Sequence, residues 1–296
     1  MKKELVSTSP NEKTGEVVKR YSAEEQKEWN SLYASFRSQS LMTGQVVGVD
    51  TQTVYRKEAD GKTKTYDVTF LVIIGYRVKI LIPETEVWYN ERSARPIHVL
   101  RSMAGATVDF IITEVNEERS CCLASRRRAL VTRRHLFSRS LVVPGDEVDI
   151  SVLAVGRTHL LATAGGVDFT LSQRDLCYGM IADLRDRFRA GDTKTALVKK
   201  YDGETGKLEV SVKEAEPHPF DGADMRHPLN CRRASVITGK YKGGVFCKLE
   251  EDLDCICTYS VDRCDEDFHI GDQVIVVVTK YNFEKKQIYG KIITKR

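Results

Sequence analysis

The chain has 296 residues, a formal net charge of +4 and 41% hydrophobic residues, which is the composition of a globular protein of two or three domains. No apolar run approaches the roughly 18 residues of a membrane span, and residues 1–16 lack the apolar core of a signal peptide, so we expect a cytoplasmic protein. The eight cysteines are therefore expected to be reduced thiols rather than a disulfide framework.

Residues 1–40 combine a polar tail with one helix. The tail is too polar to bury enough surface to fold by itself. Ser22 and Glu25 have the spacing of a capping box, which predicts the start of a helix. The apolar residues after them recur at helical intervals: Trp29, Leu32, Tyr33 and Phe36. We expect this face to pack on the domain that follows, with docking of a protein partner as the alternative.

One 21-residue pattern occurs three times without a gap, at residues 105–125, 191–211 and 271–291. Each copy opens on a glycine, has an apolar residue seven positions later and regains one at the seventeenth position. Because self-similarity at this spacing marks repeated structural units, it predicts three domains. We place them at residues 41–140, 141–215 and 233–296, with residues 216–232, which hold three prolines, as a linker.

Each unit contains short segments rich in Val, Ile, Tyr and Phe and divided by Gly, Asp and Asn, the pattern of β-strands. Residues 50–65 are polar, and the Asp60-Gly61 pair predicts a hairpin turn at the tip of an extended arm. Three early strands, a partly helical connection and a late hairpin describe a small five-stranded barrel of the OB-fold type. The predicted fold class is therefore all-β, with three tandem five-stranded OB-fold barrels and a short N-terminal helix.

At this point the sequence resembles the S1-motif RNA-binding repeats, a family named after a ribosomal protein. The likeness rests on the late hairpin at 191–211, ILIPETE at 80–86, GGVFCKL at 243–249 and LASRRRAL at 123–130. It implies an OB-fold that binds single-stranded RNA through aromatic and basic groups. Where the family has two aromatic residues in the second strand, this chain has Gly243 and Phe246. Where many members have a histidine, it has Thr258 or Pro83.

The positive charge is concentrated in the first unit, where residues 41–140 hold 16 basic and 11 acidic residues. No acidic residue occurs from Ser120 to Gly145, a stretch that contains six arginines. Lys and Arg bind phosphates, and aromatic rings stack on bases at about 1–3 kcal/mol per base. We therefore expect the first unit with its arginine-rich exit to bind RNA most tightly.

The candidate nucleic-acid-binding residues come from all three units. In the first they are Arg77, Lys79, Arg126, Arg127 and Arg128. In the second they are Arg157, His159, Phe169, Lys199, Lys200 and Tyr201. In the third they are Lys240, Tyr241, Lys242, Phe246, Lys280 and Tyr281. Phe169 and Phe246 could equally be core residues, and Lys199 and Lys200 could form a solvated surface.

The predicted function is a non-catalytic single-stranded RNA binder associated with the ribosome or with messenger RNA. Its expected partners are single-stranded RNA or DNA, the ribosome, and a protein partner on the N-terminal helix, with no membrane. The alternative is a protein-interaction scaffold of degenerate OB-folds. We expect neither an enzyme nor a cofactor, because no phosphate-binding loop, zinc-protease or nucleophile-elbow motif occurs. A zinc site at Cys255 and Cys257, with Cys247 or Cys264, is weighed against buried strand cysteines, which we prefer.

Overall fold

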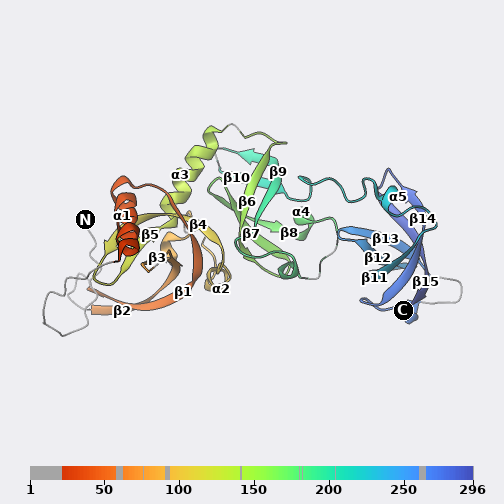
Figure 1. The fold of residues 1–296 in the computed structure, drawn as a ribbon, viewed down its shortest axis with the longest axis horizontal. Coiled ribbons are helices and arrows are strands. Elements are labelled where there is room, and N and C mark those ends of the chain that lie inside the picture. The colour runs from red at the N-terminus through yellow and green to blue at the C-terminus, as the bar shows by residue number, and fades with distance from the viewer. Residues whose placement is uncertain are drawn as a thin grey trace.

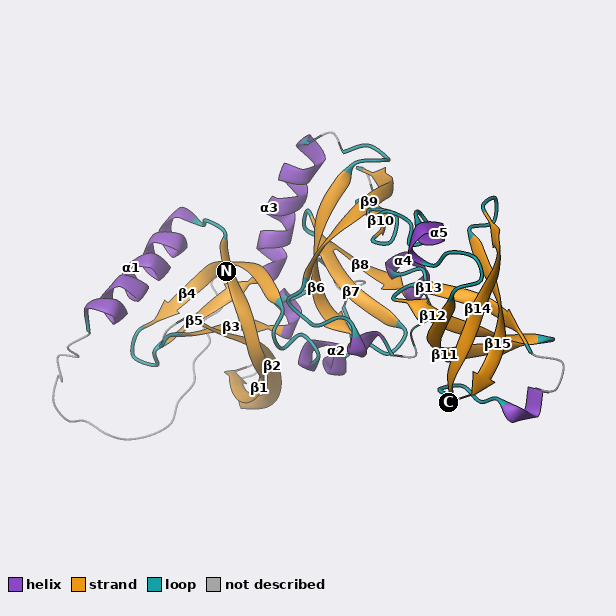
Figure 2. Ribbon diagram, turned by 45° about the vertical axis from the view of Figure 1, so that its right-hand side comes forward, coloured by secondary structure: helices purple, strands orange, loops and turns teal. Residues whose placement is uncertain are grey.

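The computed structural model describes residues 22–57, 63–75, 77–90, 94–140, 142–179, 181, 183–203, 205–259 and 265–295. The polar tail, the Asp60-Gly61 turn and Cys264 lie outside the described residues. Three β-sheets follow one another along the long axis of the molecule in chain order (Figure 1). Strands make up most of each unit, and helix α3 stands between the first and second sheets in both ribbon views (Figure 2).

The elements of each unit follow the same order. The first unit has α1 (Ala23–Ser38), β1 (Met42–Lys57), β2 (Thr63–Ile74), β3 (Lys79–Pro83), η1 (Glu84–Glu86), α2 (Ile97–Arg101), β4 (Thr107–Asn116) and β5 (Cys121–Ser125). The second has α3 (Arg126–Arg139), β6 (Glu147–Val155), β7 (His159–Ala164), β8 (Val167–Ser172), α4 (Gln173–Leu176), η3 (Leu184–Asp186), β9 (Thr193–Asp202) and β10 (Lys207–Ser211). The third has α5 (Ala223–Arg226), β11 (Arg232–Tyr241), β12 (Gly244–Glu250), β13 (Leu253–Thr258), η4 (Asp265–Asp267), β14 (Gln273–Asn282) and β15 (Gln287–Lys295).

The first and third sheets close into barrels with one topology. Their strand orders are β1-β2-β3-β5-β4 and β11-β12-β13-β15-β14. In each barrel the third and fifth strands pair in parallel and the remaining neighbours pair antiparallel. Because closure removes exposed strand edges, each barrel buries a continuous core.

The second sheet has the same strand order, β10-β9-β6-β7-β8, but it does not close. No ladder joins β8 to β10 within the described residues, although the two strands lie near one another. The prediction of three tandem barrels therefore holds for the first and third units, and the second unit corrects it.

The repeated glycine has one structural task in all three units. Its φ angle is +93° to +95°, a region that side chains disfavour. From there its N–H donates a 2.8 Å hydrogen bond to the carbonyl of the residue at which the first strand bulges. The pairs are Gly105 with Val46, Gly191 with Val152, and Gly271 with Ile237. The glycine that recurs in the sequence thus makes the same backbone hydrogen bond to the first strand in all three units.

A helix precedes each sheet and contacts a residue of its fourth strand. Helix α1 begins at the predicted capping box of Ser22 and Glu25 and buries Trp29 and Leu32 in the core of the first unit. This face is therefore occupied within the chain. In the second unit Phe137 of α3 packs edge-on against Tyr201 of β9, with ring centroids 5.2 Å apart.

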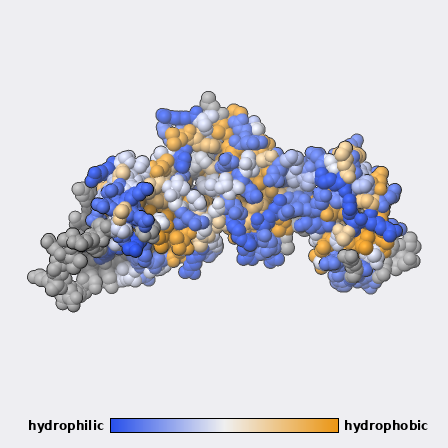
Figure 3. Space-filling view, viewed as in Figure 1, coloured by the Kyte–Doolittle hydropathy of each residue, from blue (hydrophilic) through white to orange (hydrophobic). Residues whose placement is uncertain are grey.

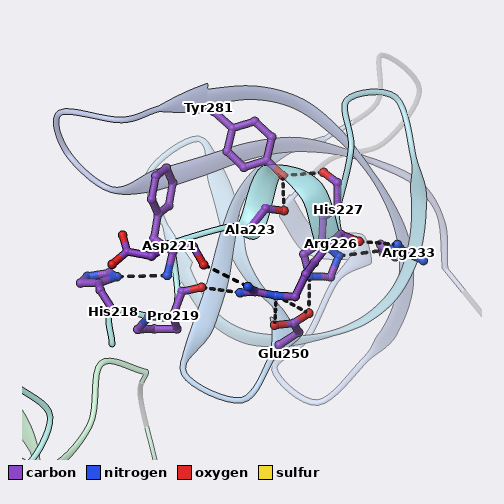
Figure 4. A network of polar contacts seen from close by, with 10 residues as sticks. His218, Pro219, Asp221, Ala223, Arg226, His227, Arg233, Glu250 and Tyr281 are labelled. Carbon is purple, nitrogen blue, oxygen red and sulfur yellow. Dashed lines mark hydrogen bonds and ion pairs between the residues drawn. The ribbon is translucent and has the colours of Figure 1, made fainter. Parts of the chain in front are cut away.

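The third unit is led by the Pro-rich segment, which carries α5. The Tyr281 hydroxyl donates to the carbonyls of Ala223 and His227 at the two ends of α5 (Figure 4). Arg226 donates to Glu250, 3.1 Å away, and Arg233 donates to the carbonyl of Arg226 at 2.6 Å. The segment predicted as a linker is thus fastened to the third barrel by named side chains.

The first two units share buried surface. Leu153, Ala154 and Leu161 of the second unit belong to the core cluster of the first. The second and third units meet through fewer contacts, where Arg187 pairs with Asp252 at 2.6 Å and the Gly179 N–H donates to the same carboxylate at 3.2 Å. No described helix is long and apolar enough to cross a membrane.

Candidate nucleic-acid interface

A row of side chains crosses the outside of the third barrel. Phe246 of β12 pairs with Ile256 of β13, Ile256 with Tyr289 of β15, and Tyr289 with Lys280 of β14. Residues paired across neighbouring strands project from the same face of a sheet. Their chain neighbours face inward and are buried: Val245, Cys247, Cys255, Cys257 and Ile288. We call Phe246, Ile256, Tyr289 and Lys280 the outer row.

A second ring enlarges the apolar surface of the outer row. Tyr241, at the end of β11, lies with its ring centroid 5.2 Å from that of Phe246, at an interplanar angle of 52°. Both rings are half-buried, so part of each faces solvent. Burial raises the pKa of the Tyr241 hydroxyl, which keeps it a neutral hydrogen-bond donor at neutral pH. The pair offers the flat apolar surface on which a nucleobase stacks.

Lysines surround this surface on several strands. Lys242, Lys248, Lys280 and Lys291 are exposed on β11 to β15 or on the turn between β11 and β12. Lys240 instead pairs with Asp265 at 3.3 Å and also donates to the carbonyl of Asp265 at 2.7 Å. Hydrogen bonds from Tyr259 and Lys240 lower the pKa of Asp265. The charge of Lys240 is therefore partly compensated within the protein.

The equivalent rows in the other two units lack aromatic rings. The register relative to the first-strand bulge gives Val72, Leu81, Leu123 and Glu114 in the first unit. It gives Leu161, Thr170, Glu209 and Lys200 in the second, with Glu209 opposite the unpaired edge of β8. Leu161 is 7% exposed because the first unit covers it. Of the three rows, the outer row of the third unit alone combines aromatic rings with lysine.

The three predicted exit arginines have protein partners at the start of α3. Arg126 is 1% exposed and binds both carboxylate oxygens of Asp168 at 2.7 Å, so it joins the first two units and is removed from the candidate surface. Arg127 donates to the carbonyls of Trp88 and Thr85 and lies 3.6 Å from Glu86. Arg128 is exposed and donates to Gln39 at 3.2 Å. The basic run that was predicted to bind RNA therefore mainly makes contacts within the protein.

The other predicted cations of the first two units are dispersed. Arg77 forms an ion pair with Glu25 of α1 and, like Lys79, is exposed. Arg157 and His159 flank the exposed turn between β6 and β7, where His159 Nδ1 lies 2.8 Å from the Thr158 hydroxyl. Lys200 is exposed on β9. None of these side chains lies beside an exposed aromatic pair like that of Tyr241 and Phe246 in the described contacts.

Three further predicted residues have structural neighbours. Tyr201 and Tyr281 hold the helices that lead their units, as described above. Lys199 pairs with Glu214 at 2.9 Å, and its hydrogen bond to that carboxylate raises its pKa. Phe169 faces the interior at the open seam of the second sheet. These residues remain predictions as binding residues, and we do not include them in the proposed surface.

Sequence reasoning missed Ile256 and Tyr289. The alternation of buried Ile288, Gly290 and Ile292 was a signal that Tyr289 faces outward, because successive side chains of a strand point to opposite faces. Ile256 lies opposite Phe246 through the antiparallel pairing of β12 with β13. Local sequence pattern does not indicate that β13 and β15 pair in parallel, which is what brings Tyr289 beside Ile256.

The buried cysteines of the third barrel are thiols. Cys247, Cys255 and Cys257 are 0% exposed and free. Hydrogen bonds with Cys247 and Cys255, together with burial, raise the pKa of Cys257. Among the residues that the structure describes, no group of three or more His, Cys, Asp or Glu is placed to hold a metal ion.

Comparison with known proteins finds several bacterial ribosomal proteins of one name. The small ribosomal subunit protein bS1 of Coxiella burnetii is 23% identical over 191 residues, covering 61% of this chain and 35% of that protein. Proteins of the same name from other bacteria match at 20–23% identity. The three units are S1-like repeats. No family model matches the chain.

Two other matches are of different kinds. The 4-hydroxy-3-methylbut-2-enyl diphosphate reductase of Clostridium tetani is 22% identical over 227 residues, covering 71% of this chain and 34% of that enzyme. A crystallised multidomain protein with nucleic acid binding domains from Streptococcus pneumoniae aligns over 86% of this chain and 73% of that chain, with a TM-score of 0.21 and 11% identity. That TM-score is too low to bear on the fold. The S1-like chain spans 34–46% of the length of the curated relatives named here and above.

Proposed function

We propose that the protein binds single-stranded RNA across the outer row of the third S1-like repeat. The observation that carries this proposal is the register of Phe246, Ile256 and Tyr289 on three neighbouring strands, with Tyr241 beside Phe246. Bases stack on such a surface whatever their sequence. The relatives named as small ribosomal subunit proteins support a nucleic-acid partner.

The lysines around the outer row supply the electrostatic part of binding. Lys242, Lys248, Lys280 and Lys291 are exposed on elements that border the rings. For single strands, each neutralised phosphate changes the slope of log affinity against log salt by about −0.7. Affinity for RNA should therefore fall as salt rises. Because Arg126 and Arg127 are engaged within the protein, the first repeat should bind more weakly than the third, which replaces the expectation from charge alone that the first unit binds most tightly. Association with the ribosome or with messenger RNA is part of this proposal.

Fluorescence polarisation with a labelled single-stranded RNA tests the proposal on the full chain. Phe246→Leu keeps an apolar side chain over the barrel but removes the ring, and it should weaken binding about tenfold. Tyr66→Ala is the matched control, because it removes an exposed aromatic ring from β2 of the first repeat. Equal affinities for the unmodified protein and Phe246→Leu, or a larger loss with Tyr66→Ala, would contradict the proposal.

A further inference from the structure

The second sheet carries a cleft at the place where the other two sheets close. β8 and β10 have no ladder between them in the described part of the chain. A cleft of about 450 Å³ opens there and is walled by both strands and by the end of the first repeat. Its walls include Tyr89, Asn90, Arg134, Phe169, Lys207 and Leu208. The hydrophobicity-coloured surface is mainly hydrophilic, with apolar residues in smaller patches (Figure 3).

Phe169 lies at the open seam of the second sheet. Its pairing with Ala162 makes it the counterpart of Ile80 in the first barrel and Cys255 in the third, which pair with Ile73 and Cys247. Those two residues are 5% and 0% exposed and pair across the closure with Cys122 and Ile288. The larger ring of Phe169 is only half-buried and lines the cleft. A larger side chain thus stands at the open seam where the two closed barrels have an isoleucine or a cysteine.

Helix α3 also holds the start of β8. Arg126 binds Asp168 through two hydrogen bonds, and Arg134 donates to the carbonyl of Gly166 at 2.9 Å. Both arginines belong to α3, whose first turn is tied to the first repeat. The start of the strand is thus held by α3, and Arg134 itself lines the cleft.

The walls of the cleft combine three kinds of group that recognise a nucleotide. Phe169 and Tyr89 supply aromatic surface, with the Arg134 guanidinium 3.6 Å above the Tyr89 ring. The facing edges of β8 and β10 have N–H and C=O groups that no ladder uses, and such groups bond the edges of bases. Lys207 is exposed and, with Arg134, can face a phosphate. The carboxylate of Asp168 is already matched by Arg126.

We propose that this cleft binds one nucleotide, with its base against Phe169 and its phosphate toward Lys207 and Arg134. The volume of about 450 Å³ is within the range of small-molecule sites. The ligand is either a free mononucleotide or one nucleotide of a single strand, because both present the same base and phosphate. The site lies in the second repeat, so a failure of this proposal would leave the proposed RNA binding by the outer row of the third repeat unaffected, and the reverse also holds.

The test titrates the full chain with AMP, GMP, CMP and UMP, followed by saturation-transfer NMR and calorimetry. We expect saturable millimolar or tighter binding of at least one nucleotide, and at least tenfold weaker binding of ribose 5-phosphate, which lacks the base. In the Phe246→Leu protein, whose outer row is weakened, a short oligonucleotide competes for the cleft whichever source supplies the nucleotide. Binding there that is tighter than that of the mononucleotide, and that Lys207→Gln weakens, identifies the strand as the source. Absence of saturable binding by all four nucleotides overturns the proposal.

Two variants locate the site. Phe169→Ile, which copies Ile80, should weaken nucleotide binding about tenfold and raise hydrogen-exchange protection of amides in β8 and β10. Lys207→Gln should weaken binding while Lys194→Gln, elsewhere in the second repeat, leaves it unchanged. If Phe169→Ile does not fold, as judged by circular dichroism, Lys207→Gln decides alone. Binding that survives Lys207→Gln unchanged, or that is lost in Phe246→Leu, overturns the assignment to this cleft.

Discussion

Arg126 and Asp168 join the first and second repeats through two parallel hydrogen bonds of 2.7 Å, with the arginine 1% exposed. The same guanidinium donates to the carbonyl of Val87 at 3.0 Å and lies 6.0 Å from the Trp88 ring. A buried ion pair of this kind fixes geometry more than it adds stability, but removal of one partner leaves an uncompensated charge.

Asp168→Ala should therefore lower the free energy of unfolding by about 3–5 kcal/mol. The cause is the buried guanidinium of Arg126 left without its carboxylate. Urea denaturation followed by circular dichroism measures the change. Arg128→Ala is the control, because Arg128 is exposed on the same helix turn and should cost far less. A loss for Asp168→Ala no larger than for the control would show that the pair is solvated in solution.

The stability losses of Gly191→Ala and Gly271→Ala, compared with each other, distinguish the cost of backbone strain from the cost of disturbing close packing between repeats. Both glycines have φ of +95°, so each substitution carries a backbone cost of about 1–2 kcal/mol. A Cβ on Gly191 would lie 2.4 Å from the Gly105 carbonyl oxygen, whereas a Cβ on Gly271 would meet nothing within 4 Å. Thermal unfolding should show the larger loss for Gly191→Ala. Equal losses would mean that the first two repeats are not packed this closely.

Lys280→Gln should flatten the salt dependence of RNA binding. Lys280 is exposed and stands at the end of the outer row, paired with Tyr289. Removal of one phosphate contact should change the slope of log affinity against log salt by about 0.7. Lys199→Gln is the comparison, since Lys199 is engaged by Glu214. Polarisation titrations at several salt concentrations measure both slopes, and an identical slope in Lys280→Gln would exclude Lys280 from the interface.

The acid stability of the second repeat should depend on Asp183. Hydrogen bonds from the Arg185 side chain and backbone lower the pKa of Asp183 to about 2 from 3.8. Because the folded-state pKa is depressed, the stabilisation is complete above pH 3.8 and is lost as pH falls toward about 2. An NMR titration of the carboxyl carbon should give this low pKa. Asp183→Asn should remove that part of the acid dependence, and an unchanged pH profile in this variant would contradict the assignment.

The recurring glycine and its spacing predicted three repeated units of five strands each, and the predicted closed barrel was right for the first and third of them. The capping box at Ser22 and Glu25 was also readable, since a cap depends on residues three apart. The state of each barrel seam was not readable. Phe169 lies in a segment whose residues alternate as in any β-strand. Only the fold shows that it occupies the position that Ile80 and Cys255 occupy in the closed barrels.

The candidate site was partly predictable for a related reason. Tyr241, Phe246 and Lys280 were expected from the family resemblance. Tyr289 joins them through the pairing of β15 with β13, whose residues are about 30 positions apart, a non-local contact that local pattern does not encode. Arg126 was misread because a run of like charges in sequence looks solvated, while its carboxylate partner is 42 residues away along the chain.

Helix α3 leads the second repeat yet also packs on β4 of the first, with Arg133 bound to Asp109 at 2.7 Å and Phe137 against Tyr201. Cleavage within α3 by a protease would remove packing contacts from both the first and the second repeat. Helix α5, in contrast, is fastened to the third barrel alone by Tyr281 and Arg233. By topology the chain has three repeats. From this packing we expect the first two repeats to stay together on proteolysis and the third repeat, which carries the outer row, to separate from them.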